Sequence, residues 1–183
     1  MLGLFTGCRS SDDDGWHPDA QFAPSLRPAF GARVTGGELQ LWTGSPCVGV
    51  TRLSVVFDLA TSGSAETVWT VPRGATTSSR GANGSGVTVE RFTLGMAPEG
   101  LTVSEPLSAG YDWRSAATAH LLVDGPPVTW GSSVELAEVT KNSAAHPDDT
   151  YYFQDVGWLD PAQVAAQDGK TFLTTCTPDP AKG

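Results

Sequence analysis

The chain has 183 residues, of which 39% are hydrophobic and 17% are charged, and these proportions are typical of a folded domain. Its formal net charge of −9 argues against binding to nucleic acid or to anionic lipid headgroups, which require a basic surface. The sequence has no uninterrupted apolar stretch of roughly 18 residues or more, so it predicts no membrane-spanning helix.

The chain divides into two parts by its hydrophobic pattern. Residues 1–33 contain several prolines and an acidic run but little periodicity, which predicts a remnant of an export signal and a flexible tether. From residue 34, short stretches of alternating apolar and polar residues are separated by clusters of Gly, Pro, Ser and Asp. This pattern predicts one all-β domain over residues 34–183, an immunoglobulin-like β-sandwich of about eight or nine strands.

The predicted strands follow from the period-2 alternation of apolar residues. In chain order they cover residues 38–42, 51–59, 66–71, 87–94, 101–104, 118–124, 128–139 (one long strand or two), 150–156 and 170–176. The clearest is 51–59, which places Leu53, Val55 and Phe57 on one face. The apolar phase shifts at Glu90 in the strand 87–94, which predicts a β-bulge at that position.

One short helix is predicted before the last strand. Asp160 is suited to cap its N-terminus, Pro161 to occupy its first turn and Gly169 to end it. Residues 72–86 are rich in Gly and Ser and predict a long loop.

Two of the three cysteines, Cys47 and Cys176, lie near the two ends of the predicted domain. Neither has a Cys or His neighbour at metal-ligand spacing, so no zinc site is predicted. In an exported protein the pair predicts a disulfide, to which the chain-entropy argument assigns at most about 5 kcal/mol. Two buried free thiols are the alternative.

Cys8 then has no cysteine partner. The residues Phe5-Thr6-Gly7-Cys8 resemble the lipobox of bacterial lipoproteins, in which small residues precede a cysteine that is diacylated and becomes the mature N-terminus. Phe5 replaces the usual Leu of that motif. The resemblance implies lipidation of Cys8, and the polar, acidic stretch after it is similar to the spacer of such lipoproteins. A working export signal needs a longer apolar stretch led by basic residues, so we expect it to begin upstream of Met1. The alternative is a disordered N-terminus with a free thiol.

A search for catalytic and cofactor motifs finds no nucleophile elbow, zinc-protease motif, phosphate-binding loop or dinucleotide-binding fingerprint. The sequence therefore predicts no catalytic residue, no cofactor and no metal ligand. We interpret His146, in the stretch His-Pro-Asp-Asp, as part of an acidic turn rather than a metal site, and His120 as a structural strand residue.

Aromatic residues supply the remaining signal for binding. The stretch Tyr111-Asp112-Trp113-Arg114 combines an aromatic face, a carboxylate and a guanidinium, as recognition sites often do, and is a weak ligand-binding candidate. The alternative is a packed corner of the sandwich. Six tryptophans could also form a platform for sugar rings, although aromatic residues more often fill sandwich cores.

The chain lacks isoleucine and has few lysines, which indicates a high-GC genome, bacterial or that of a phage or prophage. We expect a lipid-anchored envelope protein, exported to the outer face of the cytoplasmic membrane or the cell envelope. It would be anchored in the membrane by the lipid on Cys8 and would present a non-enzymatic binding domain to a protein or glycan partner. The alternatives are a soluble secreted module that binds carbohydrate or another small ligand, and a hydrolase whose site the sequence does not reveal.

Overall fold

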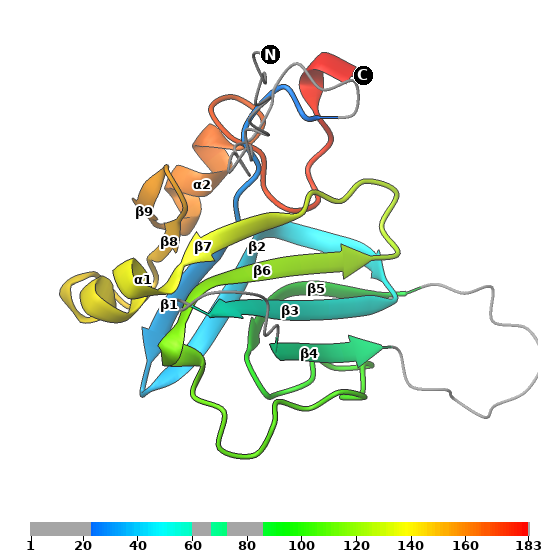
Figure 1. Ribbon diagram of the computed structural model, residues 1–183. Helices are drawn as coiled ribbons and strands as arrows, with labels where there is room; N and C mark the ends of the chain where they lie inside the picture. The colour runs from blue at the N-terminus through cyan, green and yellow to red at the C-terminus, as the bar shows by residue number, and fades with distance from the viewer. Residues whose placement is uncertain (1–22, 60–66, 73–85, 183) are drawn as a thin grey trace, which may run out of the picture.

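The computed structural model describes residues 23–59, 67–72 and 86–182 (Figure 1). Within them, two antiparallel sheets are ordered β5-β2-β1-β8-β9 and β4-β3-β6-β7. The strands are β1 (Gly31–Thr35), β2 (Glu38–Val50), β3 (Arg52–Leu59), β4 (Thr67–Pro72), β5 (Val87–Thr93), β6 (Ala116–Asp124), β7 (Ser132–Glu135), β8 (Tyr151–Phe153) and β9 (Gly157–Leu159). The helices are α1 (Leu136–Asn142), α2 (Pro161–Gln167), and the 3-10 helices η1 (Trp113–Ser115), η2 (Ser143–Ala145) and η3 (Pro180–Lys182). The predicted all-β sandwich is confirmed.

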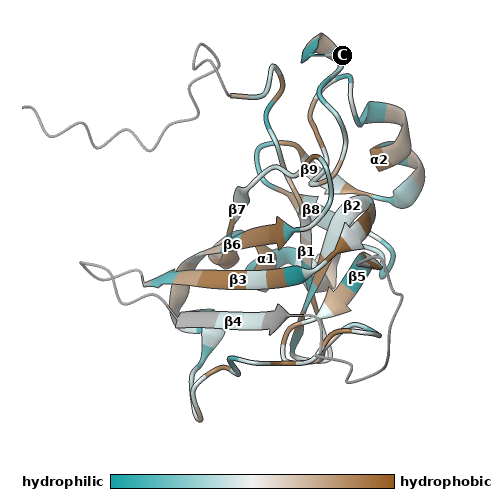
Figure 2. Ribbon diagram, turned by 90° about the vertical axis from the view of Figure 1, so that its right-hand side faces the viewer, coloured by the Kyte–Doolittle hydropathy of each residue, from teal (hydrophilic) through white to brown (hydrophobic). Residues whose placement is uncertain are grey.

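The main core lies between the two sheets. Leu53, Val55 and Phe57 of β3 are fully buried in it, as the alternation of residues 51–59 predicted. β6 pairs with β3 along its whole length and contributes buried residues at the paired positions. Figure 2 shows the resulting apolar stretches along β3 and β6.

β2 is longer than the predicted strand at 38–42, because it continues through an irregular segment. Its register against β5 passes from Trp42 opposite Arg91 directly to Cys47 opposite Val89. The sequence predicted a bulge at Glu90 of the strand 87–94, but the extra residues lie on the partner strand β2, opposite Glu90.

The fold begins earlier than residue 34, the predicted start of the domain. β1 already starts at Gly31, and Ala29 and Phe30 are fully buried. The backbone of Pro28 forms an isolated bridge with Leu173. The predicted tether over residues 1–33 is therefore too long at its C-terminal end, since apolar residues 29 and 30 supply core contacts. Residues 1–22, which include Cys8, lie outside the described part of the chain.

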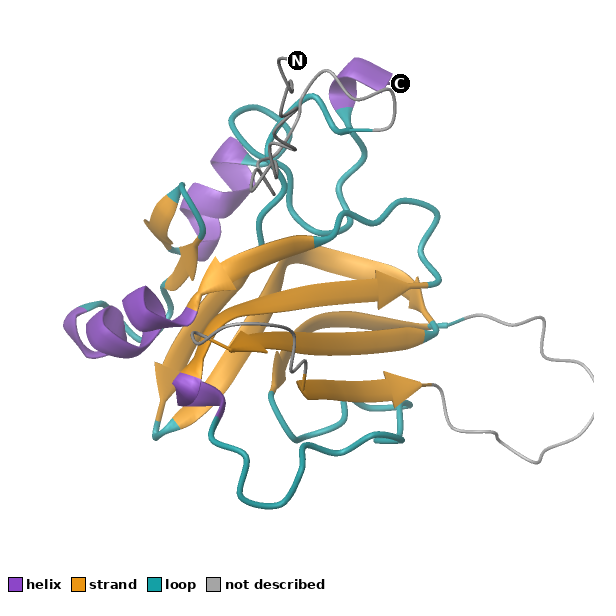
Figure 3. Cartoon of the chain, viewed as in Figure 1, coloured by secondary structure: helices purple, strands orange, loops and turns teal. Residues whose placement is uncertain are grey.

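The predicted long strand at 128–139 is wrong, because only its middle is extended. β7 ends at Glu135 and α1 begins at Leu136. Leu136 and Val139 are both buried, at a spacing that suits a helix, and a short apolar run does not separate helix from strand. α1 contacts β1 of one sheet and β6 of the other, so it covers one side of the sandwich (Figure 3).

Only the first half of the predicted strand at 150–156 is extended, and it forms the first strand of a hairpin. β8 ends at Phe153, and the chain turns through Asp155, whose φ is 61°, into β9. The predicted strands at 101–104 and 170–176 form only isolated bridges. Most of the predicted loop at 72–86 lies outside the described residues.

The predicted helix is confirmed as α2. The Asp160 side chain accepts a hydrogen bond from Gln163 N at 2.8 Å, and Gln163 Oε1 accepts one from Asp160 N at 2.9 Å. Gly169 follows with a positive φ of 73°, which suits a helix end. Val164 packs α2 into a second apolar cluster on the outer face of the five-stranded sheet.

Candidate functional site

The sequence-predicted candidate Tyr111-Asp112-Trp113-Arg114 forms a corner against the main core. Asp112 Oδ1 accepts a hydrogen bond from the Arg114 backbone N at 3.1 Å and so caps η1. The Arg114 guanidinium lies 4.5 Å from the centre of the Trp113 ring and donates to the carbonyl of Gly37. Trp113 is only 7% exposed, and Tyr111 packs against the same core. The charged groups of Asp112 and Arg114 bind each other and the backbone, whereas the buried Tyr111 hydroxyl has no hydrogen-bond partner among the residues that the structure describes.

The sequence-predicted disulfide is present between Cys47 of β2 and Cys176 of the C-terminal segment. Their Cα atoms are 5.4 Å apart, and the two cysteines are 129 positions apart in the sequence. Beside it, Asp168 accepts hydrogen bonds from the hydroxyls of Thr174 at 3.0 Å and Thr177 at 2.5 Å. The covalent bond and these hydrogen bonds hold the C-terminal segment in place.

A second group of side chains gathers on the outer face of the five-stranded sheet. Gln40 and Trp42 of β2 face outward because they alternate with core-facing leucines. Tyr151 and Phe153 of β8 face the same way and reach across β1 to Trp42, with ring centres 5.4 and 5.5 Å from it. These aromatic rings form the floor of the outer face.

Gly31 of β1 permits this crossing. It is paired with Trp42 on one side and with Phe153 on the other. A Cβ atom at this position would lie 2.8 Å from the Tyr151 Cβ and 2.9 Å from the Phe153 ring. The approach of the rings over β1 therefore requires a residue without a side chain.

Arg91 of β5 covers one edge of the aromatic cluster. Its guanidinium carbon lies 4.5 Å from the centre of the Trp42 ring and 5.9 Å from that of Tyr151. Trp42 Nε1 donates to Glu90 Oε1 at 3.2 Å, and the same oxygen is 4.0 Å from Arg91 Nη2. The rings position the guanidinium. It still reaches solvent, because the Arg91 side chain is 45% exposed.

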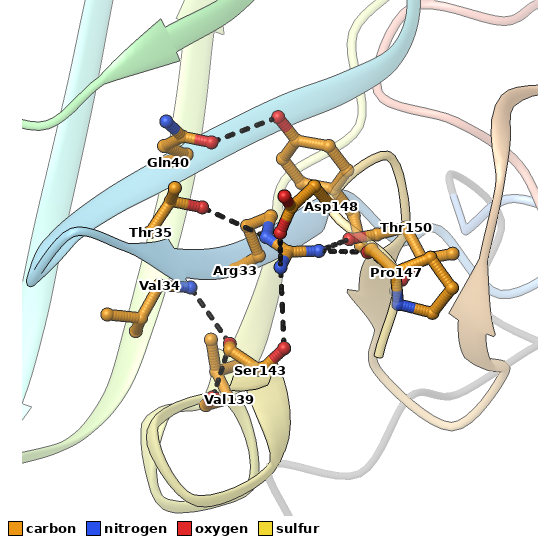
Figure 4. Close-up of polar contacts among 10 residues, drawn as sticks. Arg33, Val34, Thr35, Gln40, Val139, Ser143, Pro147, Asp148 and Thr150 are labelled. Carbon is orange, nitrogen blue, oxygen red and sulfur yellow. Dashed lines mark hydrogen bonds and ion pairs between the residues drawn. The ribbon is translucent and has the colours of Figure 1, made fainter. Parts of the chain in front are cut away.

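A pocket of about 190 Å³ lies beside this guanidinium and is lined by Gln40, Arg91, Phe92, Thr93 and Tyr151. We call it the outer-face pocket. The Tyr151 hydroxyl donates to Gln40 Oε1 at 3.4 Å, which turns the amide nitrogen of Gln40 away from Tyr151 (Figure 4). The pocket thus combines one cation with hydroxyl and amide groups, a set suited to a polar or acidic group.

Arg33 lies next to Gln40 on the outer face of β1 and is bonded to the segment that precedes β8 (Figure 4). It pairs with Gln40 in the β1–β2 register, and its side chain is only 2% exposed. The guanidinium donates to Thr35 Oγ1 at 3.0 Å, the carbonyls of Pro147 at 2.5 Å, Thr150 at 2.7 Å and Ser143 at 3.3 Å, and Asp148 Oδ1 at 3.2 Å. These five bonds match the five N–H groups of an arginine. They fix the segment that leads directly into Tyr151.

The electrostatics keep Tyr151 neutral. Burial raises the pKa of the Tyr151 phenol, and the positive charges of Arg91 and Arg33 oppose part of that rise. At neutral pH the side chain therefore presents a hydroxyl rather than a phenolate to the outer-face pocket.

A histidine, a carboxylate and a hydroxyl meet on the four-stranded sheet, the combination that the hydrolase alternative requires. His120 Nε2 is 2.6 Å from Asp58 Oδ2 and 3.3 Å from Thr118 Oγ1, which itself donates to the same carboxylate oxygen at 3.1 Å. A catalytic triad uses one ring nitrogen for the nucleophile and the other for the carboxylate. Here one nitrogen meets both partners, so the geometry is that of a surface ion pair.

The His-Pro-Asp-Asp stretch sends its side chains to different partners. His146 stacks on Trp158 with ring centres 4.3 Å apart and planes 12° apart, whereas Asp148 binds Arg33. Among the residues that the structure describes, no three His, Cys, Asp or Glu side chains are grouped closely enough to hold a metal ion.

The tryptophans within the described ranges are all at least half-buried. Trp42, Trp69 and Trp113 are buried, and Trp130 and Trp158 are intermediate. A platform for stacked sugar rings needs exposed aromatic faces, so these five rings do not form one.

The chain matches no known protein family, and neither the curated proteins nor the solved structures contain a significant match to it. No helix in the described part is long and apolar enough to cross a membrane.

Sequence reasoning missed the outer-face pocket. Period-2 alternation had placed two leucines of β2 on one face, which leaves Gln40 and Trp42 on the other. That signal places only one of the five lining residues, Gln40. Arg91 and Tyr151 join it only through strand pairing, and no local pattern specifies which strands are neighbours.

Proposed function

We propose that the chain is a lipid-anchored cell-envelope protein that presents a non-enzymatic binding domain outside the membrane. The disulfide between Cys47 and Cys176 carries this proposal, since disulfides form and persist mainly in oxidising compartments outside the cytoplasm. With these two cysteines paired, Cys8 of the Phe5-Thr6-Gly7-Cys8 motif is available for the lipid. Two acyl chains on one cysteine suffice for stable anchoring.

The path of the chain after the anchor supports the same proposal. The backbone N of Ser25 donates to Asp179 Oδ2 at 2.6 Å, and Ala29 N donates to the carbonyl of Leu173 at 2.9 Å. Residues 25–29 are thus docked onto the C-terminal segment, which the disulfide ties to β2. A lipid at Cys8 would therefore attach the sandwich to the membrane through the end of the fold that the disulfide between Cys47 and Cys176 fixes to β2.

Binding fits the outer-face pocket better than catalysis does. Its polar groups are a guanidinium, two hydroxyls and an amide, which hold a ligand but do not form a nucleophile–base pair. The His120–Asp58–Thr118 contact gives no support to the hydrolase alternative, because one ring nitrogen serves both partners. A glycan or protein of the envelope that carries a polar or acidic group is the partner we propose.

The second candidate is a soluble secreted module that binds a small ligand. The outer-face pocket supports it equally, because the two candidates share the binding domain and differ only at Cys8. The half-buried or buried tryptophans of the described residues give no support to a stacked-sugar version of it.

The test is expression from the native genomic locus, with the upstream sequence intact, of wild type, Cys8→Ser and the control Ser10→Ala. We expect wild type and Ser10→Ala to enter the detergent phase on Triton X-114 partitioning, and Cys8→Ser to remain in the aqueous phase. Equal partitioning of wild type and Cys8→Ser would reject the anchor and leave the soluble module.

A further inference from the structure

Arg91 places a positive charge at the mouth of a small pocket in a protein whose net charge is −9. Its nearest acidic partner is Glu90, whose Oε1 is 4.0 Å away and already accepts a hydrogen bond from Trp42 Nε1. An ion pair at this distance in an exposed position neutralises little of the charge. The guanidinium therefore remains available to an anion.

The other groups around the pocket decide what kind of anion fits. Gln40 and Thr93 offer an amide N–H group and a hydroxyl, whereas the Tyr151 hydroxyl donates its proton to Gln40 Oε1, and none of the three adds positive charge. Arg33 lies next to Gln40, with its N–H groups bound to protein oxygens. One available cation with neutral donors matches a monoanion, and a planar guanidinium fork matches a carboxylate in shape. A phosphate dianion would leave charge uncompensated.

The size of the pocket limits the ligand to one functional group. Pockets that enclose a whole small molecule measure about 300–1,000 Å³, whereas this one measures about 190 Å³. It therefore suits the acidic group of a larger molecule whose remainder lies over the sheet.

The donors are held in place before any ligand arrives. Trp42 fixes the plane of Arg91 from below, and Arg33 fixes the backbone that leads into Tyr151. Gly31 lets the Tyr151 ring lie across β1 toward the Gln40 side chain. A preorganised donor set loses less conformational entropy on binding than a mobile one.

We propose that the outer-face pocket binds the carboxylate of a larger ligand, with Arg91 as its charged anchor, Gln40 and Thr93 as neutral donors, and Tyr151 as the group that orients the Gln40 amide. Carboxylates of this kind occur on acidic sugars and at peptide C-termini. The inference rests on the proposed binding function and names the chemical group that is bound; it does not depend on the lipid at Cys8.

The test is an NMR titration of the ¹⁵N-labelled, disulfide-bonded protein. Binding is monitored through the side-chain N–H signals of Arg91 and Gln40. The probes are glucuronate for the acidic sugar and N-acetylglycine for the peptide terminus. Glucose, N-acetylglycinamide and sodium chloride at equal ionic strength are the matched controls. We expect saturable shifts with at least one carboxylate and none with the controls.

Substitutions assign the effect to the pocket. Arg91→Gln should weaken carboxylate binding by about tenfold or more, and Arg91→Lys should weaken it less because it keeps the charge but loses the fork. Arg52→Gln removes an exposed arginine elsewhere, on β3, and should leave the affinity unchanged. Dispersed spectra of each variant confirm that it is folded.

The possible outcomes distinguish the two sources of carboxylate, and they separate this inference from the proposal of a lipid anchor. Saturation by glucuronate alone identifies an acidic sugar, saturation by N-acetylglycine alone a peptide terminus, and saturation by both shows that the carboxylate suffices. No saturation by either probe, equal shifts with the uncharged controls, or unchanged affinity in Arg91→Gln would overturn the inference. Lipid-dependent partitioning of Cys8 with no carboxylate binding would reject this inference and leave the anchor standing.

Discussion

Arg33 shows at the scale of a single residue how a buried charge organises the outer face. Its guanidinium donates to the carbonyl oxygens of Ser143, Pro147 and Thr150. Thr150 is buried, whereas the carbonyls of Ser143 and Pro147 also accept from backbone N–H groups. Hydrogen bonds from a charged donor contribute more than neutral ones, and an orphaned buried acceptor is costly. One residue therefore joins β1 to the loop that precedes β8.

We predict that Arg33→Lys lowers the free energy of unfolding by about 3 kcal/mol, because an ammonium group cannot replace the five-donor fork. Urea unfolding followed by tryptophan fluorescence measures the loss. The matched control Arg52→Lys changes an exposed arginine whose contact with Asp124 is 3.8 Å long, and should shift the value by less than about 0.5 kcal/mol. Equal effects of the two substitutions would contradict the role assigned to Arg33.

Asp58 gives a prediction of pH dependence. The hydrogen bond from His120, with a smaller contribution from Thr118, holds the pKa of the Asp58 carboxyl below its usual value of 3.8, although burial acts against this. A lowered pKa in the folded state stabilises the fold above the unfolded pKa, and this stabilisation is lost as pH falls through the lowered value.

Between pH 5 and pH 3 wild type should therefore lose more stability than Asp58→Asn, which has no carboxylate to protonate there. Urea midpoints at several pH values measure the difference. Asp149→Asn, which changes an exposed aspartate, should follow the wild-type curve. If Asp58→Asn follows it as well, the ion pair makes no contribution.

At the scale of elements, α2 depends on its capping residues. Asp160 and Gln163 exchange side-chain-to-backbone hydrogen bonds across the first turn. We predict that Asp160→Ala lowers the free energy of unfolding by about 1 kcal/mol. Asp149→Ala, the control, should have little effect on the urea midpoint. If Asp160→Ala leaves the urea midpoint unchanged, the packing of Val164, and not the cap, stabilises the helix.

The elements that the sequence predicted correctly are those with strong local signals. Residues 51–59 alternate without a break, the phase shift at Glu90 marks the residue opposite the bulge, and Asp160 and Pro161 mark a helix start. The sequence predicts strand where α1 lies, because Leu136 and Val139 fit either structure in so short a run. The β8–β9 turn depends on Asp155 with a positive φ, which the surrounding residues do not signal.

The candidate site was less predictable than the fold, for a physical reason. Arg91 meets Trp42 through the β2–β5 register, and Tyr151 reaches Gln40 by crossing β1. Both contacts join residues far apart in the chain, and they depend on strand order and on the missing side chain of Gly31. The predicted candidate at 111–114 had the right composition for binding, but its two charged side chains, Asp112 and Arg114, pair with each other.

At the scale of the whole molecule, the disulfide links the two ends of the fold. Closing a loop between residues 129 positions apart restricts the unfolded chain strongly. We predict that the double substitution Cys47→Ala and Cys176→Ala lowers the free energy of unfolding by about 2–5 kcal/mol. Dithiothreitol should lower the urea midpoint of wild type and of Cys8→Ser, but not that of the double variant. An unchanged wild-type midpoint under reduction would contradict a structural role for the bond.

The central proposal joins Cys47 and Cys176 in a disulfide and attaches a lipid to Cys8. The most direct test is therefore peptide mass mapping without reduction. The protein should be extracted with detergent from the membranes of its native host. We predict a cross-linked peptide pair containing Cys47 and Cys176, and an N-terminal peptide that begins at Cys8 and carries the mass of a diacylglyceryl group. Recovery of Cys8 in a peptide of unmodified mass, from protein in which Cys47 and Cys176 are linked, would contradict the anchor.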